Sequence, residues 1–234
     1  MTDAPMTIKV GGVAGQHADG LRVIASDAPA GTVIVHGGGA EVAEWSGRSG
    51  LAPVIRDGLR VSDPTTLEVV VAVLGGLVNT RIVAALAAAG RAAVGLTGVD
   101  GGLLRLQRRD PALGEVGEVT GVEPALLDLL AGAGLLPVVA SIGPAPEGGV
   151  LNVNADEVAG ALAAARGGRL LLCTDVAGVQ LDGRVLDRLG AGLARRMLED
   201  GSASSGMRPE LRAALAAAGA GCDVRVVGGR WAAG

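Results

Sequence analysis

The single lysine of this 234-residue chain, Lys9, lies just before two glycines in the stretch MTIKVGG, and the other nineteen basic residues are all arginine. A lysine ends in a compact ammonium with rotatable donors, whereas an arginine ends in a broad planar fork. Glycine allows the backbone to approach an anion closely, because it carries no side chain. The lysine retained beside Gly11 and Gly12 therefore indicates a site for a crowded anionic group.

Glycine clusters follow several predicted strands, and each could bring backbone N–H groups to a ligand. The four clusters are residues 9–12, 36–39, 95–102 and 174–178. In open α/β sheets, ligands bind beyond the carboxyl ends of the strands, and the N-terminus of a following helix attracts anions. Four such clusters in one chain favour an anionic ligand over four tight turns. The spacings of a Walker loop and of a dinucleotide-binding loop are both absent from the sequence.

The stretch LNVNAD places Asn152, Asn154 and Asp156 at alternating positions before an alanine-rich helix. One of them, Asn154 or Asp156, is expected to cap that helix through its side-chain oxygen. A cap accounts for one polar residue, and alternating residues of an extended segment point to the same side. The stretch is therefore a candidate ligand-binding segment, with helix capping as the competing interpretation.

The stretch GLRVSD contributes Arg60, which lies before a Ser-Asp-Pro helix start. Asp63 fits the capping position and Pro64 the first helical position. A guanidinium in a glycine-rich loop suits bidentate binding of a carboxylate, and the alternative is an arginine exposed to solvent. For His36, at the end of an apolar strand, we expect a hydrogen-bonded core residue rather than a catalytic base.

These side chains need a scaffold, and the chain alternates short β-branched runs with Ala/Leu-rich stretches of helical length. The expected strands cover residues 7–10, 32–36, 92–96, 136–140, 170–173 and 223–227, and the expected helices cover residues 65–74, 80–89, 124–133, 155–166, 192–199 and 209–218. The alternation predicts an α/β fold with a central, mainly parallel sheet. Segments 111–121 and 144–149 are expected to form loops or a small antiparallel excursion.

Composition and charge exclude several classes of function. The chain is 1% aromatic and has a net charge of −4 without a basic block, which argues against nucleic-acid binding. Arg105, Arg108 and Arg109 form only a small basic patch, expected on a solvated loop. Interrupted apolar stretches and the lack of a signal pattern predict a cytoplasmic protein without a membrane span. Cys173 and Cys222 are isolated, which fits a reducing compartment and offers no metal-ligand cluster.

In their order and spacing, nine motifs of the chain resemble the amino acid kinase family and, within it, its acetylglutamate kinase branch. They are IKVGG, IVHGGG, GLRVSD, GGLVN, AVGLTGVDGG, LPVVASIG, LNVNADEVAGALA, CTDVAGV and SGMRPEL. The resemblance implies a three-layer αβα sandwich. It also implies an acyl-amino-acid-binding lobe over about residues 1–150 and a C-terminally short nucleotide-binding lobe over about residues 151–234.

The implied reaction transfers the γ-phosphoryl group of ATP to the side-chain carboxylate of N-acetyl-L-glutamate, which gives N-acetylglutamyl 5-phosphate for arginine biosynthesis. Such a transfer needs two repelling anions held in line and positive charge at the moving phosphoryl group. Backbone N–H groups, an ammonium and Mg²⁺ can supply that charge. The Mg²⁺ ion would be held mainly by ATP oxygens and water, so the lack of a metal-binding motif is consistent with it.

The resemblance also assigns roles to individual residues. Lys9 would stabilise the transferring phosphoryl group, and Asp156 would orient the lysines. Gly38 and Gly39 would line the acyl-amino-acid site, where the substrate ligands are Arg60, for the α-carboxylate, and Asn152. The implied phosphate- and ATP-binding residues are Gly11, Gly12, Thr174, Asp175, Val176, Ala177, Gly178, Val179 and Gln180.

The chain departs from the family pattern at Glu210, because the stretch GMRPEL has a carboxylate where the family has a second lysine. Arg208 and Arg212 are the candidate replacement cations. Losing one transition-state donor costs roughly 3–4 kcal/mol. The alternatives are therefore a kinase with a relocated cation, a slow kinase, or a catalytically silent relative that binds ligands.

A rival substrate is aminoadipate or glutamate linked to an acidic amino-group carrier protein, because KVGGVAG, GLVN and GVDGGLL resemble that branch of the family. Docking of a carrier would need a basic surface, for which the patch at residues 105–109 is the local candidate. The resemblance further implies a homodimer. We expect no arginine feedback of the kind that hexameric relatives exert through an N-terminal extension.

Overall fold

The computed structural model describes residues 4–11, 18–174, 179–181, 184–186, 189–204 and 206–228. Its centre is a six-stranded sheet with the order β14-β11-β1-β2-β8-β5, in which all neighbouring strands run parallel. The strands are β1 (Met6–Val10), β2 (Val33–His36), β5 (Ala93–Thr97), β8 (Leu136–Ala140), β11 (Arg169–Thr174) and β14 (Asp223–Gly228). Each lies within one residue, at either end, of an expected strand, so that prediction is confirmed.

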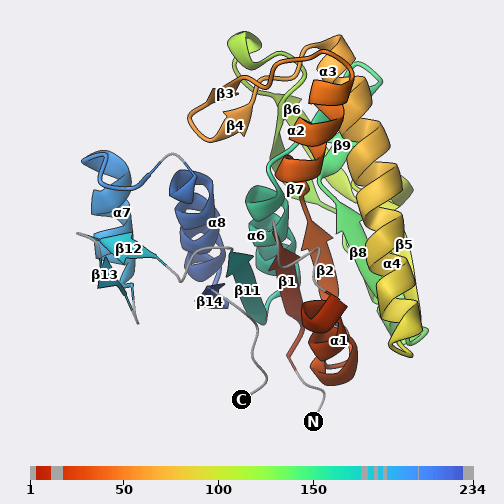
Figure 1. The fold of residues 1–234 in the computed structure, drawn as a ribbon. Coiled ribbons are helices and arrows are strands. Elements are labelled where there is room, and N and C mark those ends of the chain that lie inside the picture. The colour runs from red at the N-terminus through yellow and green to blue at the C-terminus, as the bar shows by residue number, and fades with distance from the viewer. Residues whose placement is uncertain are drawn as a thin grey trace.

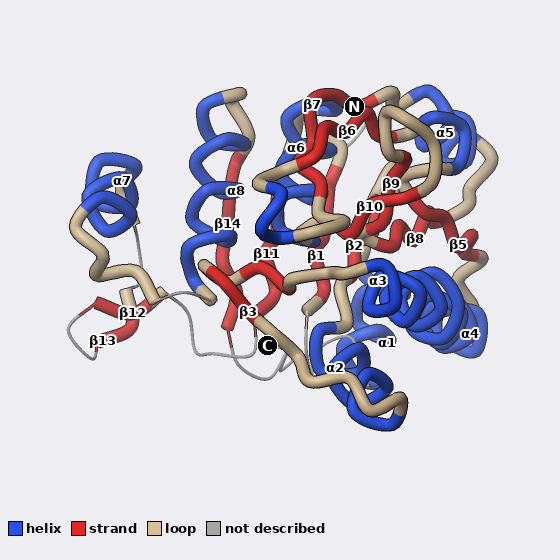
Figure 2. Tube along the Cα trace, turned by 90° about the horizontal axis from the view of Figure 1, so that it is seen from above, coloured by secondary structure: helices blue, strands red, loops and turns tan. Residues whose placement is uncertain are grey.

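Helices cover both faces of this sheet (Figures 1 and 2). One face carries α1 (Ala18–Asp27), α2 (Gly39–Arg48) and a long helix, Pro64–Ala88; the other carries α5 (Ala125–Gly132), α6 (Ala155–Arg166) and α8 (Met207–Gly219). Ile8 and Ile34 belong to the apolar cluster under the first group of helices, and Val33 and Val35 belong to the cluster under the second. Successive strand residues thus face opposite layers, and the expected three-layer αβα sandwich is confirmed.

The apolar stretch after Asp63 forms one continuous helix rather than the two shorter helices expected at residues 65–74 and 80–89. It consists of α3 (Pro64–Val70), a π-helical segment η2 (Val71–Val78) and α4 (Asn79–Ala88). The break expected between these two helices does not occur, because the π-helical segment carries the chain through Gly75 and Gly76. A Cβ atom on Gly75 would make only an ordinary contact, at 3.5 Å, with Cδ1 of Ile142. Asp63 caps the helix, as expected, by accepting a hydrogen bond of 2.7 Å from the backbone N–H of Thr66.

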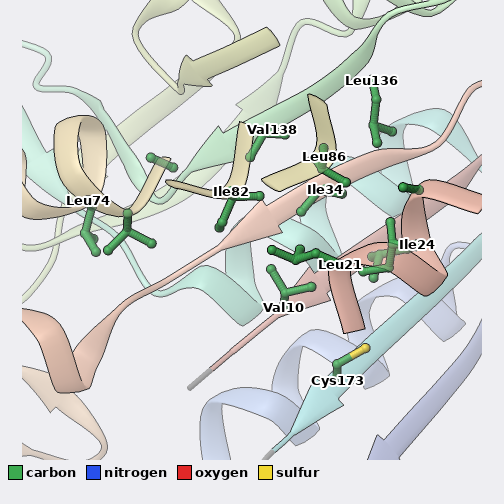
Figure 3. Close-up of a cluster of buried hydrophobic side chains, with 14 of the residues drawn as sticks. Val10, Leu21, Ile24, Ile34, Leu74, Ile82, Leu86, Leu136, Val138 and Cys173 are labelled. Atoms are coloured by element: carbon green, nitrogen blue, oxygen red, sulfur yellow. The ribbon is translucent and has the colours of Figure 1, made fainter. Parts of the chain in front are cut away.

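By length and composition, the helix Pro64–Ala88 would pass as a membrane span. In the structure, its Leu74, Ile82 and Leu86 side chains are buried in the apolar cluster of Figure 3, together with Ile34 and Val138 of the sheet. The same helix contacts α1, α2, β5 and β8. Its apolar composition is therefore explained by its place in the core of the domain.

Smaller elements surround the carboxyl ends of the strands. Three antiparallel pairs are β3 (Ile55–Arg56) with β4 (Leu59–Arg60), β6 (Leu104–Arg108) with β7 (Gly117–Val122), and β9 (Ile142–Pro144) with β10 (Val150–Asn152). Two short 3₁₀ turns, η3 (Asp100–Gly102) and η4 (Pro111–Leu113), flank β6. The small antiparallel elements expected around residues 111–121 and 144–149 are confirmed as the β6–β7 and β9–β10 pairs.

One more group of elements lies beyond the sheet edge formed by β14 (Figure 1). It consists of β12 (Gln180–Leu181), β13 (Arg184–Val185) and α7 (Ala191–Glu199), and α7 packs against α8. A third apolar cluster, which includes Met197 and Leu211, joins α7 to α8.

Candidate active site

Lys9 lies at the carboxyl end of β1, in the middle of the sheet, and forms an ion pair with Asp156 of α6. Its Nζ is 2.8 Å from Oδ1 of Asp156, and the two side chains are only 14% and 11% exposed. Burial acts to lower the pKa of Lys9, but the charge and hydrogen bond of Asp156 and the charge of Glu210 together raise it. The buried lysine is therefore positively charged at neutral pH.

The Lys9 side chain folds back over Gly11, the first glycine of the loop after β1. A Cβ atom on Gly11 would stand 2.6 Å from Nζ and 3.1 Å from Cε of Lys9. A side chain at position 11 would therefore displace the Lys9 ammonium from its present position. Gly12 lies outside the described residues.

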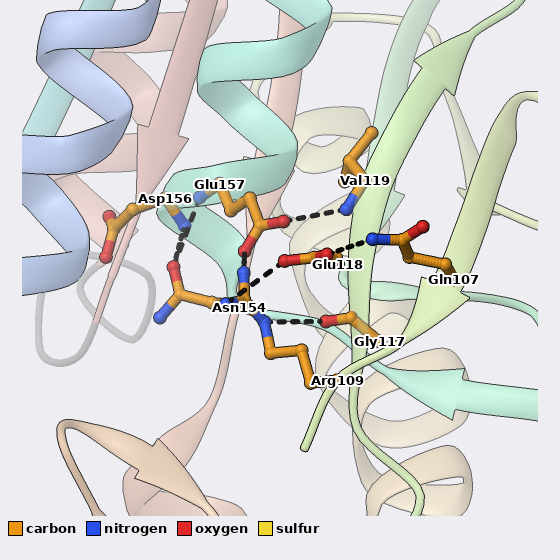
Figure 4. Close-up of polar contacts among 8 residues, drawn as sticks. All are labelled: Gln107, Arg109, Gly117, Glu118, Val119, Asn154, Asp156 and Glu157. Atoms are coloured by element: carbon orange, nitrogen blue, oxygen red, sulfur yellow. Dashed lines mark hydrogen bonds and ion pairs between the residues drawn. The ribbon is translucent and has the colours of Figure 1, made fainter.

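The first turn of α6 is held by a network that leaves Asp156 free for Lys9. The side-chain oxygen of Asn154 accepts hydrogen bonds from the backbone N–H groups of Asp156, at 2.9 Å, and Glu157, at 3.1 Å. Glu157 also binds Arg109 and accepts a hydrogen bond from the backbone N–H of Val119. In Figure 4, the Asp156 carboxylate points away from Arg109 and Val119. Of the two residues expected as the cap, Asn154 is the one used.

A cavity of ≈250 Å³ opens beside this ion pair. Its lining includes eight residues singled out in the sequence: Lys9, Gly11, Gly38, Gly39, Arg60, Asn152, Asn154 and Asp156. Its apolar lining includes Val42, Ile55, Leu59, Val70 and Leu74. The topology therefore brings the predicted anion-binding and carboxylate-binding residues to one cavity, as strands that end at the same edge of a sheet should do.

Arg60 reaches this cavity from the β3–β4 hairpin. Its Nη2 donates a hydrogen bond of 2.9 Å to the backbone oxygen of Gly39. Its Nη1 is buried, and no hydrogen-bond partner for it lies among the described residues. Burial lowers the pKa of this guanidinium. The Nη2 group of Arg60 is thus fixed by the protein, whereas the Nη1 group retains N–H donors for a ligand.

The glycines after β2 form the N-terminus of α2. Gly38 is the N-cap residue and makes no side-chain cap hydrogen bond, so N–H groups of the first turn remain available to an anion. A Cβ atom on Gly38 would stand 2.8 Å from Cδ2 of Leu74 and 3.2 Å from Cγ2 of Val78. Close packing of the π-helical segment therefore also requires a glycine at this position.

Glu210 lies in the first turn of α8 and is only 7% exposed. Burial, followed by the charge of Asp156, raises its pKa to about 7, and the charge of Lys9 opposes that shift. The structure thus places Glu210 beside the Lys9–Asp156 pair. Arg208 and Arg212 instead line an outer groove of ≈500 Å³ with the β3–β4 and β6–β7 segments.

The expected nucleotide-binding stretch begins at the carboxyl end of β11, beside β1. Thr174, Val179 and the backbone of Gln180 are described, whereas Asp175, Val176, Ala177 and Gly178 lie outside the described residues. Val179 lines a second cavity, of ≈840 Å³, between α7, α8 and β14.

His36 is a satisfied core residue, as expected, and its partner Asn79 is a residue that the sequence analysis did not identify. Nδ1 of His36 donates to the backbone oxygen of Gly37 at 2.8 Å, and Nε2 accepts from Nδ2 of Asn79 at 3.0 Å. Asn79 also donates to the backbone oxygens of Val138, at 2.9 Å, and Leu96, at 3.3 Å. A single amide within the apolar stretch GGLVN was the available signal. Burial lowers the pKa of His36, so it is neutral and has no free nitrogen to act as a base.

The basic patch expected at Arg105, Arg108 and Arg109 is largely neutralised, because acidic side chains form ion pairs with two of these arginines. Arg108 forms ion pairs with Glu115 and Glu147. Arg109 forms ion pairs with Glu118, at 3.4 Å, and with Glu157. Moreover, Arg105 and Arg108 belong to β6 rather than to a loop.

The chain is similar in sequence and in fold to known proteins. The Amino acid kinase family profile matches residues 7–228 of the chain. An acetylglutamate kinase from Methanopyrus kandleri is 44% identical over 232 residues, covering 94% of this chain and 93% of that protein. An acetylglutamate kinase from Rubrobacter xylanophilus is 43% identical over 227 residues, covering 96% and 88%. The crystal structure of smu.665 from Streptococcus mutans UA159 has a TM-score of 0.89 at 27% identity, covering 97% and 98% of the two chains.

Proposed function

The chain belongs to the amino acid kinase family, and from this premise we propose that it transfers the γ-phosphoryl group of ATP to the side-chain carboxylate of N-acetyl-L-glutamate. The proposal makes the chain an acetylglutamate kinase, as its relatives are named. The observation that carries it is the ≈250 Å³ cavity that contains both the Lys9–Asp156 pair and the Arg60 side chain. A substrate with two carboxylates needs two such cationic groups.

The proposed substrate fits the lining of the cavity. The free Nη1 of Arg60 would bind the α-carboxylate, and Asn152, whose Nδ2 already donates to Oγ of Ser62 at 3.0 Å, would bind a further polar group. Val42, Ile55 and Leu74 would contact the acetyl group and the aliphatic part of the chain. The side-chain carboxylate would then lie toward Lys9.

Catalysis would depend on positioning and charge. Lys9 would stabilise the negative charge of the transferring phosphoryl group, with Asp156 holding the ammonium in place. The free N–H groups at the start of α2 would bind phosphate oxygens or the attacking carboxylate. In such a transfer, the attacking oxygen and the departing nucleotide oxygen lie roughly in line with the phosphorus. Because the protein supplies little covalent chemistry, its main task is to hold the two reactants in this geometry.

ATP would occupy the side of the sheet formed by β1 and β11. Gly11 and Gly12 would bind its phosphates, and Thr174 through Gln180 would bind the nucleoside. The ≈840 Å³ cavity beside Val179 supports this assignment, because it lies next to that stretch and is large enough for a nucleoside. Mg²⁺, held mainly by ATP oxygens and water, would neutralise phosphate charge.

A carrier-linked substrate is the second candidate, and one observation favours it. The outer groove of ≈500 Å³ is lined by Arg56, Arg108, Arg109, Arg208 and Arg212, and it shares Leu59 with the substrate cavity. An acidic carrier could dock along such a groove. Asp57, Asp110 and Glu118 line it as well and reduce its positive charge, which is why the free acetylated amino acid is the first candidate.

A coupled assay separates the candidates. The protein is supplied with ATP, Mg²⁺ and either N-acetylglutamate or the carrier-linked amino acid, and ADP release is followed. We expect turnover with N-acetylglutamate. Turnover with the carrier-linked substrate alone would select the second candidate. No turnover with either substrate, despite measurable ATP binding, would overturn both and leave a silent ligand-binding relative.

We further propose that the enzyme is a cytoplasmic homodimer, on the strength of its family membership. Light scattering coupled to size-exclusion chromatography measures the mass directly. A mass equal to one 22.9 kDa chain at micromolar concentration would contradict the dimer.

A further inference from the structure

Three charged side chains lie close together where β1, α6 and α8 meet, and their charges do not balance. Lys9 contributes one positive charge, while Asp156 and Glu210 contribute two negative charges. All three are largely buried: the Lys9 and Asp156 side chains are 14% and 11% exposed, and Glu210 is 7% exposed. The group therefore carries one excess negative charge when all three are ionised.

Lys9 forms an ion pair with only one of the two carboxylates. Its Nζ is 2.8 Å from Oδ1 of Asp156. Oε1 of Glu210 is buried, and no hydrogen-bond partner for it lies in the part of the chain that the structure describes. A position in the first turn of α8 favours a negative charge, but it does not explain why a carboxylate oxygen is buried without a partner, which is costly.

The packing of two helices fixes the carboxylates near each other. Asp156 and Glu210 lie in the first turns of α6 and α8. One turn further along, a Cβ atom on Gly160 would stand 3.0 Å from the backbone oxygen of Ala213 and 3.1 Å from its Cβ. The two helices are thus nearly in backbone contact, and the carboxylates at their N-termini form a preorganised pair.

We propose that Asp156 and Glu210 together bind one divalent cation, Mg²⁺ in the cell, between the N-terminal turns of α6 and α8. Carboxylate oxygens are preferred ligands of Mg²⁺, which commonly takes one or two carboxylates and completes its coordination with water and phosphate oxygens. Asp156 pairs with Lys9 through Oδ1 and can use its other oxygen for the cation. Asp156 and Glu210 would be the two protein ligands; among the described residues, no group of three or more His, Cys, Asp or Glu side chains could hold a metal ion.

This cation is additional to the Mg²⁺ that the nucleotide brings, and its role rests on the proposed kinase function. It would provide a positive charge next to Lys9, where the chain has no second lysine. A metal ion would in this way replace a missing side-chain cation.

The binding itself is tested without nucleotide and without turnover. Mn²⁺, a spectroscopic probe for Mg²⁺ sites, is titrated into the nucleotide-free protein, and free Mn²⁺ is measured by electron paramagnetic resonance. We expect the wild type to bind one Mn²⁺ ion that added Mg²⁺ displaces. In Glu210→Gln and Asp156→Asn, the affinity should fall by roughly tenfold or more, as for other losses at metal sites.

The matched control is Glu199→Gln, which removes an exposed carboxylate at the end of α7 and should bind Mn²⁺ as the wild type does. Glu210→Gln keeps the shape of the side chain, and circular dichroism verifies that each variant is folded. If the wild type binds no Mn²⁺, or if folded Glu210→Gln binds it equally well, the proposal is overturned.

A second measurement connects the site to catalysis. At a fixed, saturating concentration of MgATP, the rate of the wild type should rise severalfold as free Mg²⁺ is increased. Glu210→Lys should lose that dependence, because an ammonium would occupy the place of the cation. An unchanged Mg²⁺ dependence in Glu210→Lys would contradict the role. If the protein bound Mn²⁺ but had no kinase activity, the cation site would be supported and the proposed function would be wrong. If the protein were an active kinase but bound no Mn²⁺, the proposed function would be supported and the cation site would be wrong.

Discussion

At the residue scale, the site depends on one ammonium that cannot be exchanged for the basic group used everywhere else in the chain. We predict that Lys9→Arg lowers kcat by roughly 100-fold or more, as the loss of a transition-state donor does elsewhere, while ATP binding largely survives. The reason is space: the Lys9 side chain is only 14% exposed and lies over the backbone of Gly11, and a guanidinium is broader than an ammonium. Steady-state kinetics and calorimetric ATP titration measure the two quantities. Unchanged turnover would remove Lys9 from catalysis.

Gly11 should matter to catalysis for the same reason. In Gly11→Ala, the new methyl group would occupy space that the Lys9 side chain now fills, and a displacement of about 1 Å at a reacting centre can cost roughly 100-fold in rate. We expect kcat to fall on that scale with little change in thermal stability. Gly47→Ala is the matched control, because a Cβ atom on this exposed glycine of α2 would meet no atom within 4 Å, and the variant should keep full activity. Equal activity of both variants would contradict the close contact.

At the scale of elements, the spacing of Asp156 and Glu210 is set by the contact between α6 and α8. In Gly160→Ala, the added methyl group meets the Ala213 backbone at 3.0 Å, so the helices must shift apart. Overpacking of this kind costs about 1–3 kcal/mol, and thermal unfolding measures it. Mn²⁺ affinity should fall as the carboxylates separate.

Gly219→Ala, near the end of α8, is the control for this change, because nothing lies within 4 Å of its Cβ position. It should unfold at the wild-type temperature or slightly above, since alanine favours a helix over glycine. If Gly160→Ala behaved in the same way as Gly219→Ala, the close approach of the two helices would be wrong.

The strands could be predicted from the sequence, because both faces of the sheet are covered and the strands are consequently rich in apolar, often β-branched residues. β8, for example, is fully buried along LPVVA. α2 could not be predicted, because it begins with glycine and mixes charged and apolar residues in GAEVAEWSGR. The continuity of the helix Pro64–Ala88 was also not predictable, because glycine is unfavourable inside a helix and the pair Gly75–Gly76 instead lies within a π-helical segment.

The site could be predicted in part for a similar reason. Lys9, Arg60, Asn152 and Asp156 lie in glycine-rich or polar stretches near strand ends, which converge at one edge of a parallel sheet. The burial of Glu210 against Asp156 depends on how α6 packs on α8. No local pattern in the stretch GMRPEL carries that information, so it required the structure.

At the scale of the whole molecule, His36 and Asn79 connect the long helix to the middle of the sheet. Through Asn79, α4 is bonded to His36 of β2, to Val138 of β8 and to Leu96 of β5. His36 is 1% exposed and is the last residue of β2, an inner strand of the sheet. Asn79 donates to Nε2, so His36 must be neutral with its proton on Nδ1. If Nε2 were protonated, its N–H group would face the Nδ2 donor of Asn79, and the hydrogen bond between His36 and Asn79 would be lost.

We therefore predict that the stability of the whole fold falls in acid partly through His36. Burial lowers its pKa in the folded state, against the opposing effects of the Gly37 hydrogen bond and the charge of Glu41. In the unfolded chain its pKa is about 6.5. As pH falls through 6.5, the unfolded chain binds a proton that the folded chain does not bind. The free energy of unfolding should thus decrease by up to about 1.4 kcal/mol per pH unit, and this contribution is fully present above pH 6.5.

Urea unfolding of the wild type and His36→Gln at several pH values between 7.5 and 5 isolates this contribution. The absolute stability of His36→Gln will be lower, because the hydrogen bonds around Asn79 change, so the slopes are the quantity to compare. The contributions of all groups other than His36 are common to both proteins and cancel in the difference. The wild type should lose stability more steeply below pH 6.5 than His36→Gln does. Parallel slopes would mean that His36 can be protonated inside the folded protein, and its assignment as the neutral junction of sheet and helix would then be wrong.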